Sequence, residues 1–169
     1  MAFDRRIGYV IGIDPDAIKS GLCVYNRQTR VMEIACLTFP EILERVKKVY
    51  EVHKELPFMA FVEAGWLNKG NWHVTESRNG KMSPSAWAAA VGTSVGACNA
   101  VSKNLLECFK FYGIPCSPIK PLRKCWQGPD KKITHKELVK ELNIYQVKYD
   151  FKRSNQEERD AALICLINI

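Results

Sequence analysis

The sequence lacks the clustered histidines and cysteines of a zinc site or a disulfide scaffold. Its three histidines are isolated, and its seven cysteines are odd in number, scattered along the chain and never spaced as C-x-x-C. Because structural zinc sites and disulfide frameworks need such clusters, we expect reduced thiols and no structural zinc.

Long apolar runs are also missing. Even the mostly apolar stretch at residues 86–101 is broken by Thr93, Ser94 and Asn99, which makes it a poor candidate for a membrane span. The apolar run at residues 7–13 has only the length of a strand, and no small-residue cleavage site follows it. We therefore expect a cytoplasmic protein with no signal peptide and no membrane contact.

Negative charge is in the minority, because 18 Asp and Glu face 25 Lys and Arg and leave a net charge of +7. A positive excess favours a polyanionic partner such as nucleic acid. The length of 169 residues and the apolar content of 47% suit one globular domain, and no linker, internal repeat or low-complexity tract divides the chain. We predict a single domain over residues 1–169.

Short apolar runs bounded by turn residues predict five strands. The first three follow one another closely, with "DPDAIKSG" and "NRQTR" between them, and so predict an antiparallel meander. The fourth run ends on a carboxylate, Glu63, just as the first ends on Asp14. The five runs lie at residues 7–13, 21–26, 31–39, 58–63 and 114–119.

Helical periodicity and capping residues predict four helices, which start near residues 40, 84, 134 and 154. The first shows Ile42, Val46 and Val49 at helical spacing, and the last two open with the capping boxes "THKE" and "SNQE". The last three helices end near residues 112, 142 and 167. This order of elements predicts an α/β fold in which a mixed sheet is flanked by helices.

Two further features are open to more than one interpretation. Small residues recur every four positions on the long helix, at Ala88, Gly92, Gly96 and Ala100. This stripe suits close packing of the helix on its own sheet, which we favour, or a dimer seam. The polar segment at residues 66–83 is predicted to be a long loop, and long loops in compact domains are often functional.

Four acidic residues form the main candidate site. Asp14 and Glu63 end two strands that would share one edge of the sheet if they are neighbours, while Glu157 and Asp160 are three apart on one helical face. Clustered carboxylates repel one another, and an oxygen-only set without His or Cys suits Mg²⁺ or Mn²⁺. Two such ions could serve phosphodiester hydrolysis.

Each acid also has a structural interpretation when it is taken alone. Asp14 precedes a proline and could be an ordinary turn residue, Glu63 could be a solvated strand end, and Glu157 could simply complete the capping box of its helix.

Taken together, these segments resemble the RuvC family of Holliday junction resolvases. "IGIDPDAIKSG" resembles the first acidic motif of that family, "FVEAGW" the second, and "NQEERDAALICL" its C-terminal acidic helix. The resemblance spans nearly the whole chain, including "VGTSVGACNAV" and the basic segment before "THKELVKEL". It implies the RNase H-like fold, with three antiparallel strands followed by two parallel ones, and a homodimer that makes metal-dependent symmetric nicks in four-way DNA junctions.

The resemblance also implies roles for the acids. Asp14 would bridge two Mg²⁺ ions, for which Mn²⁺ could substitute, Glu63 and Asp160 would each anchor one ion, and Glu157 would complete the set. The same comparison suggests a branch-migration helicase as a further partner, in DNA recombination and repair.

Basic and aromatic residues are carried over in the same way. Trp66 stands three residues after the second acid, where the family has an aromatic that reaches into the junction core; its alternative is a loop anchor on the domain surface. Lys124 and Lys136 resemble basic residues that flank the family's active site, and Lys136 is the better match for a catalytic role. Arg123, Lys131 and Lys132 would follow the DNA backbone, or form only a solvated basic loop.

Two positions depart from the family pattern. Asp16 stands where the first motif usually has glycine, so either the turn differs or an extra acid lies near the metals. The loop at residues 66–83 is longer than is typical, and its His73 is left out of the predicted site. Two alternative functions remain open: an RNase H-like nuclease for other branched DNA or RNA–DNA hybrids, and a junction-binding protein without activity.

Overall fold

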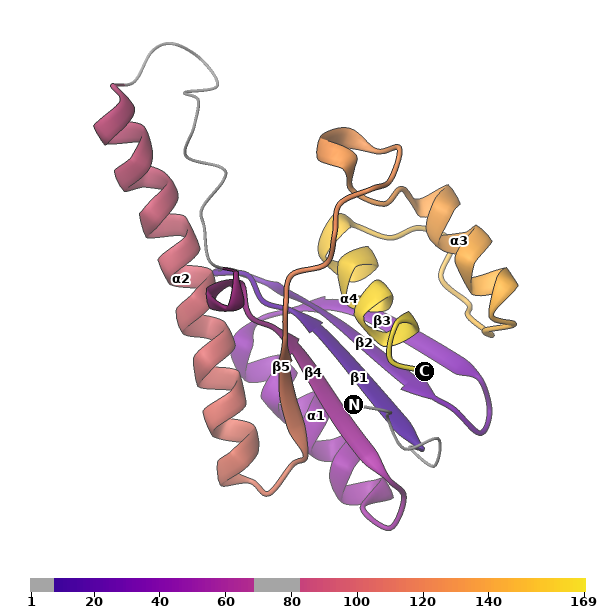
Figure 1. Cartoon of the computed structure of the whole chain (residues 1–169). Helices are drawn as coiled ribbons and strands as arrows, with labels where there is room; N and C mark the ends of the chain where they lie inside the picture. The colour runs from indigo at the N-terminus through magenta and orange to yellow at the C-terminus, as the bar shows by residue number, and fades with distance from the viewer. Residues whose placement is uncertain (1–7, 69–82) are drawn as a thin grey trace.

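The computed structural model describes residues 8–68 and 83–169, which form one mixed five-stranded sheet with helices on both faces (Figure 1). The strand order is β3-β2-β1-β4-β5. The strands are β1 (Tyr9–Asp14), β2 (Ser20–Asn26), β3 (Val31–Leu37), β4 (Phe58–Glu63) and β5 (Cys116–Ile119). The helices are α1 (Phe39–His53), α2 (Pro84–Phe111), α3 (His135–Ile144) and α4 (Gln156–Leu166), with short 3-10 turns η1 (Gly65–Leu67) and η3 (Pro129–Lys131).

The pairing of the strands confirms the predicted sheet. β1, β2 and β3 form the antiparallel meander, whereas β4 runs parallel to β1 and β5 runs parallel to β4. Strands one and four are therefore neighbours. All four predicted helices are present, and within the described residues no helix is long and apolar enough to cross a membrane.

The two faces of the sheet carry separate apolar clusters. Ile11, Ile13 and Val62 pack toward α1 and α2, while Val10 and Phe61 pack toward α3 and α4. Side chains of a strand alternate between faces, so Asp14 and Glu63 continue the rows of Val10 and Phe61 and belong to the α4 face. The alternation of β1 and β4 thus places both carboxylates on one side of the sheet.

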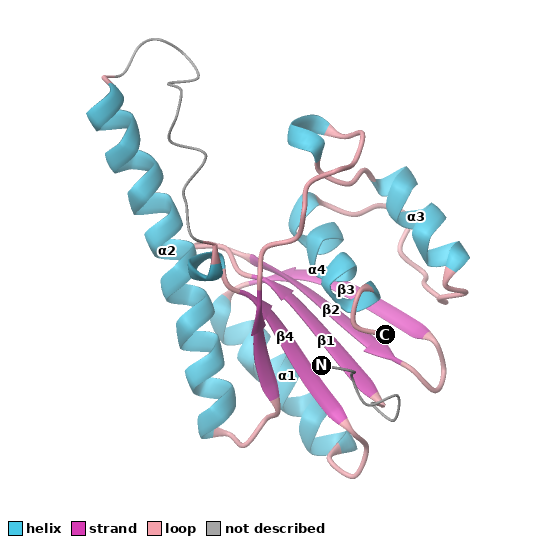
Figure 2. Cartoon of the chain, viewed as in Figure 1, coloured by secondary structure: helices cyan, strands magenta, loops and turns pink. Residues whose placement is uncertain are grey.

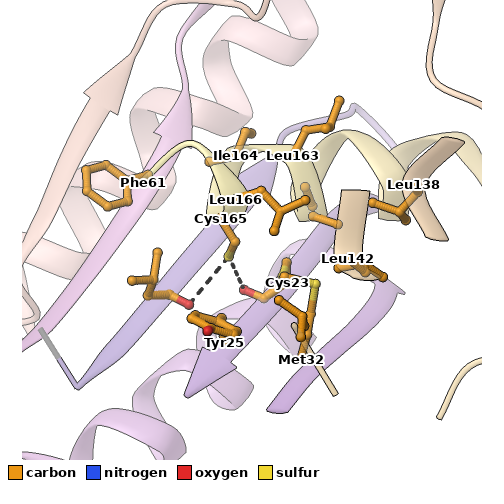
Figure 3. Packing of buried hydrophobic residues seen from close by; sticks show 14 of the residues in the cluster. Cys23, Tyr25, Met32, Phe61, Leu138, Leu142, Leu163, Ile164, Cys165 and Leu166 are labelled. Carbon is orange, nitrogen blue, oxygen red and sulfur yellow. Dashed lines mark hydrogen bonds between the residues drawn. The ribbon is translucent and has the colours of Figure 1, made fainter. Parts of the chain in front are cut away.

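Helix α4 lies unusually close to β1 and β2. A Cβ atom on Gly12 would stand 2.3 Å from the Ala161 carbonyl oxygen, and one on Gly21 would stand 1.9 Å from the Glu157 carbonyl oxygen. The Cys165 thiol donates to the Val10 carbonyl at 3.5 Å and to the Cys23 carbonyl at 3.6 Å (Figure 3). The helix can lie this close only because Gly12 and Gly21 have no side chains. The close approach brings the first turn of α4 to the end of β1.

The start of α4 differs by one residue from the predicted capping box. Asn155, not Ser154, is the N-cap, and its partner is Glu158 rather than Glu157. The Ser154 hydroxyl instead bonds the His135 ring at 2.8 Å, which ties α4 to α3. The carboxylate of Glu157 is therefore not used for capping, and the structural interpretation given for it above is wrong.

The small-residue stripe of α2 does not pack on the sheet. The buried residues of this 28-residue helix all lie in its second half, and the first half extends beyond the sheet (Figure 1). A Cβ on Gly92 or Gly96 would meet nothing within 4 Å. The favoured interpretation of the stripe, packing on the domain's own sheet, is wrong, because the sheet ends before the stripe begins.

Candidate active site

A pocket of about 540 Å³ opens at the edge of the sheet where β1, β4 and β5 end. Figure 2 shows that the loops after these strands and the first turn of α4 converge there. Asp14, Glu63 and Asp160 line the pocket, together with the basic side chains of Arg123, Lys124 and Lys132. Three predicted acids from three distant parts of the chain therefore meet in one pocket.

The strand register brings Asp14 and Glu63 side by side. Ile13 pairs with Val62 in the parallel β1–β4 ladder, and each acid is the next residue along its strand. The end of β4 is held from both sides: the Ser102 hydroxyl donates to the Glu63 carbonyl oxygen at 2.7 Å, and the Leu122 amide lies 3.4 Å from Glu63 Oε2. The first contact fixes the backbone at the end of β4, and the second holds the Glu63 carboxylate.

Asp160 enters from α4 and is held by two groups. Gln156 Nε2 donates to its Oδ1 at 2.8 Å, and Lys132 Nζ lies 3.8 Å from its Oδ2. The lysine belongs to the loop between β5 and α3, so this ion pair joins two elements across the pocket. Exposed fractions of 33% for the lysine side chain and 23% for the aspartate side chain place the pair at the pocket wall rather than in bulk water.

Burial raises the pKa values of the three carboxyls, and repulsion by neighbouring acids adds to the shift at Asp14 and Glu63. The pKa of Asp14 is raised well above its ordinary value, first by burial and then by Glu63 and Asp160. Burial is also the largest cause of the raised pKa of Glu63 and of Asp160. Lys132 opposes the shift at all three acids. Lys124 also lowers the pKa of Glu63 and of Asp160, so the cations of the pocket compensate its concentrated negative charge only in part.

This donor set has the chemistry of a hard-cation site. The three side chains offer only carboxylate oxygens, which are the ligands that Mg²⁺ and Mn²⁺ prefer, and their repulsion is the kind that a divalent ion relieves. As they stand, however, no three His, Cys, Asp or Glu side chains among residues 8–68 and 83–169 are grouped closely enough to hold an ion. Two of the acids are turned instead to the Lys132 ammonium and the Leu122 amide.

Glu157 stands close to this group without lining the pocket. Its charge contributes to the raised pKa of Asp14, as the last and smallest of the causes. Its carbonyl oxygen lies over Gly21, so its backbone is held against β2. The structure therefore brings all four predicted acids to one end of the sheet, with Glu157 at the periphery.

Comparison with solved structures agrees with this architecture. The chain matches a structure of Thermus thermophilus RuvC in complex with a Holliday junction substrate, at a TM-score of 0.51 and 17% identity, over 94% of this chain and 90% of that one. The chain has a RuvC-like fold. A second structure of RuvC from the same organism matches at a TM-score of 0.48 and 18% identity, over 94% and 91% of the two chains. No protein-family model matches the sequence, and no curated protein does.

Within the RuvC-like fold, the basic residues predicted to bind DNA fall into two groups. Arg123, Lys124 and Lys132 line the pocket beside the acids. Lys131 and Lys136 are exposed and are not among the lining residues. The pocket geometry therefore favours Lys124 and Lys132 over Lys136 as the cations nearest to the acids, and a catalytic role for Lys136 stays a prediction.

Among the described residues, Trp66 and Trp126 lie near the site in different environments. Trp66 is half-buried against the cluster under α2, with Lys103 Nζ 5.4 Å from its ring centroid, and it does not line the pocket. This packing suits the surface-anchor alternative, and stacking in the junction core stays a prediction. Trp126 does line the pocket. Sequence reasoning assigned it no role, although an aromatic within a basic segment was the available signal. His73, in the predicted loop at residues 66–83, lies outside the described residues.

The departure at Asp16 has a local explanation. Its Oδ1 accepts the Ile18 amide at 3.0 Å, while its backbone amide donates to the Ser20 hydroxyl at 3.0 Å. The side chain therefore closes the turn after β1 as an Asx turn. Its Oδ2 lies 4.0 Å from the Cys98 thiol of α2. Asp16 does not line the pocket, so the different-turn interpretation is the one that the structure supports.

Metal-free stability offers a first test of this charge cluster. Because the folded protein holds protons on Asp14, Glu63 and Asp160 that the unfolded chain releases, stability should fall as pH rises from the ordinary carboxyl range through the raised pKa values. In EDTA, Asp14→Asn should therefore melt above the wild type at pH 8, and the two should converge near pH 4. Differential scanning fluorimetry across this range measures the difference, and a gap independent of pH would contradict the cluster.

Proposed function

We propose that the protein is a metal-dependent endonuclease that resolves four-way DNA junctions by symmetric nicking. The observation that carries the proposal is the convergence of Asp14, Glu63 and Asp160 in a pocket lined by cations, at the strand ends of a RuvC-like fold. The neighbouring structure is that of a RuvC bound to a Holliday junction substrate. In this proposal the protein acts in DNA recombination and repair, with a branch-migration helicase as an additional partner.

Asp14, Glu63 and Asp160 would hold Mg²⁺ or Mn²⁺, with Glu157 as a further oxygen donor beside them. Two such ions, when bound, supply an activated water and stabilise the charge on the leaving oxygen of a phosphodiester. Binding would draw together carboxylates that stand apart in the metal-free protein, with Lys132 released from its pairing with Asp160.

The basic residues of the pocket would bind the DNA. Lys124, Lys132 and Arg123, which line the pocket, would contact the phosphates next to the cleaved bond, since a polyanionic backbone binds where cations line a groove. Lys131 and Lys136 would contact the backbone farther away. Trp66, at the start of the loop after β4, would contribute stacking in the junction core.

A homodimer is required for two symmetric nicks, and α2 offers the surface for it. The first half of the helix carries Ala88, Gly92 and Gly96 away from its own sheet, and Ala100 continues the stripe into the second half. Gly92 and Gly96 leave room for another backbone. We propose that this stripe is the dimer seam, with a second copy of the chain against it.

The dimer can be tested by sedimentation velocity in the absence of DNA. Gly96→Arg would place an unpaired charge in the seam and should weaken dimerisation at least about 100-fold. Thr29→Arg, in the exposed turn after β2, adds the same charge elsewhere and should leave the dimer intact. A monomeric wild type, or equal behaviour of the two variants, would argue against this seam.

The decisive experiment is cleavage of a labelled synthetic four-way junction with and without Mg²⁺, beside flap, duplex and RNA–DNA hybrid substrates. We expect paired, symmetric nicks in the junction that depend on the metal. Preference for flaps or hybrids would indicate a nuclease of another specificity, and tight metal-independent binding without nicks would indicate a junction-binding protein.

A further inference from the structure

Two residues of α4 that do not line the pocket form a continuous network with two that do. Arg159 and Gln156 lie in the first turns of the helix, and neither is needed for its cap, which Asn155 and Glu158 complete. Both side chains are partly buried. Their contacts lead directly to Asp160 and to the neighbour of Lys132.

The Arg159 guanidinium uses all three of its nitrogens. Its Nε donates to the Ile133 carbonyl oxygen at 2.8 Å, its Nη1 donates to the Ser154 carbonyl oxygen, and its Nη2 donates to Gln156 Oε1 at 2.9 Å. Ile133 is buried and directly follows Lys132. Arg159 therefore fastens the loop that carries Lys132 to the helix that carries Asp160.

The same guanidinium decides which way the Gln156 amide faces. Because arginine can only donate, Gln156 must turn its oxygen to Arg159 and its nitrogen outward. That nitrogen donates to Asp160 Oδ1 at 2.8 Å, while Lys132 Nζ lies 3.8 Å from Oδ2. Both oxygens of the carboxylate are engaged, so its direction is determined by the network rather than by free rotation.

We propose that Arg159 and Gln156 are positioning residues for the acidic site: Arg159 orients the Gln156 amide, which orients Asp160, and it sets the distance of Lys132 from that carboxylate. This inference rests on the proposed function, since it assumes that Asp160 binds a divalent ion. Glutamine is suited to the central position because it accepts from one neighbour and donates to the other with the same amide.

The test is the affinity for Mn²⁺, measured by isothermal titration calorimetry of the full chain without DNA. Gln156→Met preserves the length and volume of the side chain but can neither accept from Arg159 nor donate to Asp160. We expect Mn²⁺ to bind about 10- to 100-fold more weakly, as is usual when a partner of a metal ligand is removed. Gln28→Met, in the exposed turn after β2, is the matched control and should bind as the wild type does.

A second variant keeps the test informative if Gln156→Met does not fold. Arg159→Lys keeps the positive charge but cannot reproduce the three-way donation, and it should weaken Mn²⁺ binding in the same direction. Arg45→Lys is its control, because Arg45 lies on α1 and forms a surface ion pair with Glu33 of β3. Junction cleavage by either site variant should recover as Mn²⁺ is raised, whereas a loss of fold would not be restored by the ion.

The outcomes separate the two proposals. Wild-type affinity in both Gln156→Met and Arg159→Lys, in protein that binds Mn²⁺ and cleaves junctions, would overturn the positioning role and leave the proposed function intact. A wild type that binds no Mn²⁺ would overturn both. Weakened binding in the two site variants, with unchanged controls, is the expected result.

Discussion

Asp14→Asn should abolish junction cleavage while preserving junction binding. Of the three pocket acids, Asp14 has the most strongly raised pKa. Its carboxyl interacts electrostatically with Glu63, Asp160 and Glu157. An amide removes the charge that the ions need, and metal-ion stabilisation of the reacting phosphate is worth several kcal/mol. We expect the single-turnover rate constant to fall at least about 1,000-fold, equivalent to about 4 kcal/mol.

Binding should survive this change because one negative charge is removed from a pocket that must accept a phosphate. Electrophoretic mobility shifts in EDTA should show an affinity for the junction equal to or higher than that of the wild type. Asp150→Asn, at an exposed loop position, is the control and should cleave normally. Loss of folding or of binding in Asp14→Asn would give the residue a structural role instead.

Gly21→Ala should damage both stability and the site. The added Cβ would lie 1.9 Å from the carbonyl oxygen of Glu157 and 2.4 Å from its carbonyl carbon, which are backbone atoms that cannot rotate away. The first turn of α4 must therefore move from β2. Such overpacking costs about 1–3 kcal/mol, and each kcal/mol lowers Tm by roughly 2–4 °C in a domain of this size. Because that turn leads to Asp160, we expect Mn²⁺ affinity to fall as well.

Gly113→Ala is the control that separates a loss of stability from a loss of Mn²⁺ affinity. Gly113 follows the C-terminal end of α2 and has a φ of +67°, with nothing within 4 Å of the added atom. Alanine there costs about 1–2 kcal/mol through the backbone alone. Its Tm should fall, as in Gly21→Ala, with Mn²⁺ affinity unchanged. Equal loss of Mn²⁺ binding in both variants would mean that the site responds to global stability and not to the docking of α4.

The strand ends show how far local sequence reasoning reaches. Apolar runs that stop at Asp14 and Glu63 predicted two acids at one edge of a mixed sheet, and the parallel register of β1 and β4 confirms it. This worked because strand alternation is a local property with a period of two, so the face of a strand-end residue follows from its neighbours.

Helix contacts were predicted less well. The cap of α4 is displaced by one residue because Ser154, an equally good N-cap in sequence, is held by His135 of another helix. The stripe of α2 was expected to pack on the sheet, yet the sheet does not extend to Gly92 and Gly96. Both outcomes depend on residues that are distant in the chain, His135 for the cap and the sheet strands for the stripe, and local periodicity carries no information about them.

The sequence by itself determined the strands, the helices, the mixed sheet and the choice of four candidate acids. Alternation, capping and carboxylate chemistry depend only on residues that are close together in the chain. Only the tertiary structure decided that Lys132 and Trp126 line the pocket and that Lys136 does not. It also decided that Gln156 bonds Asp160 and that Arg159 bonds Gln156. The physical reason is that these relations depend on how closely α4 and the loop before α3 approach the sheet. For α4, that distance is set by packing at Gly12 and Gly21, two positions whose importance appears only when the helix lies over them.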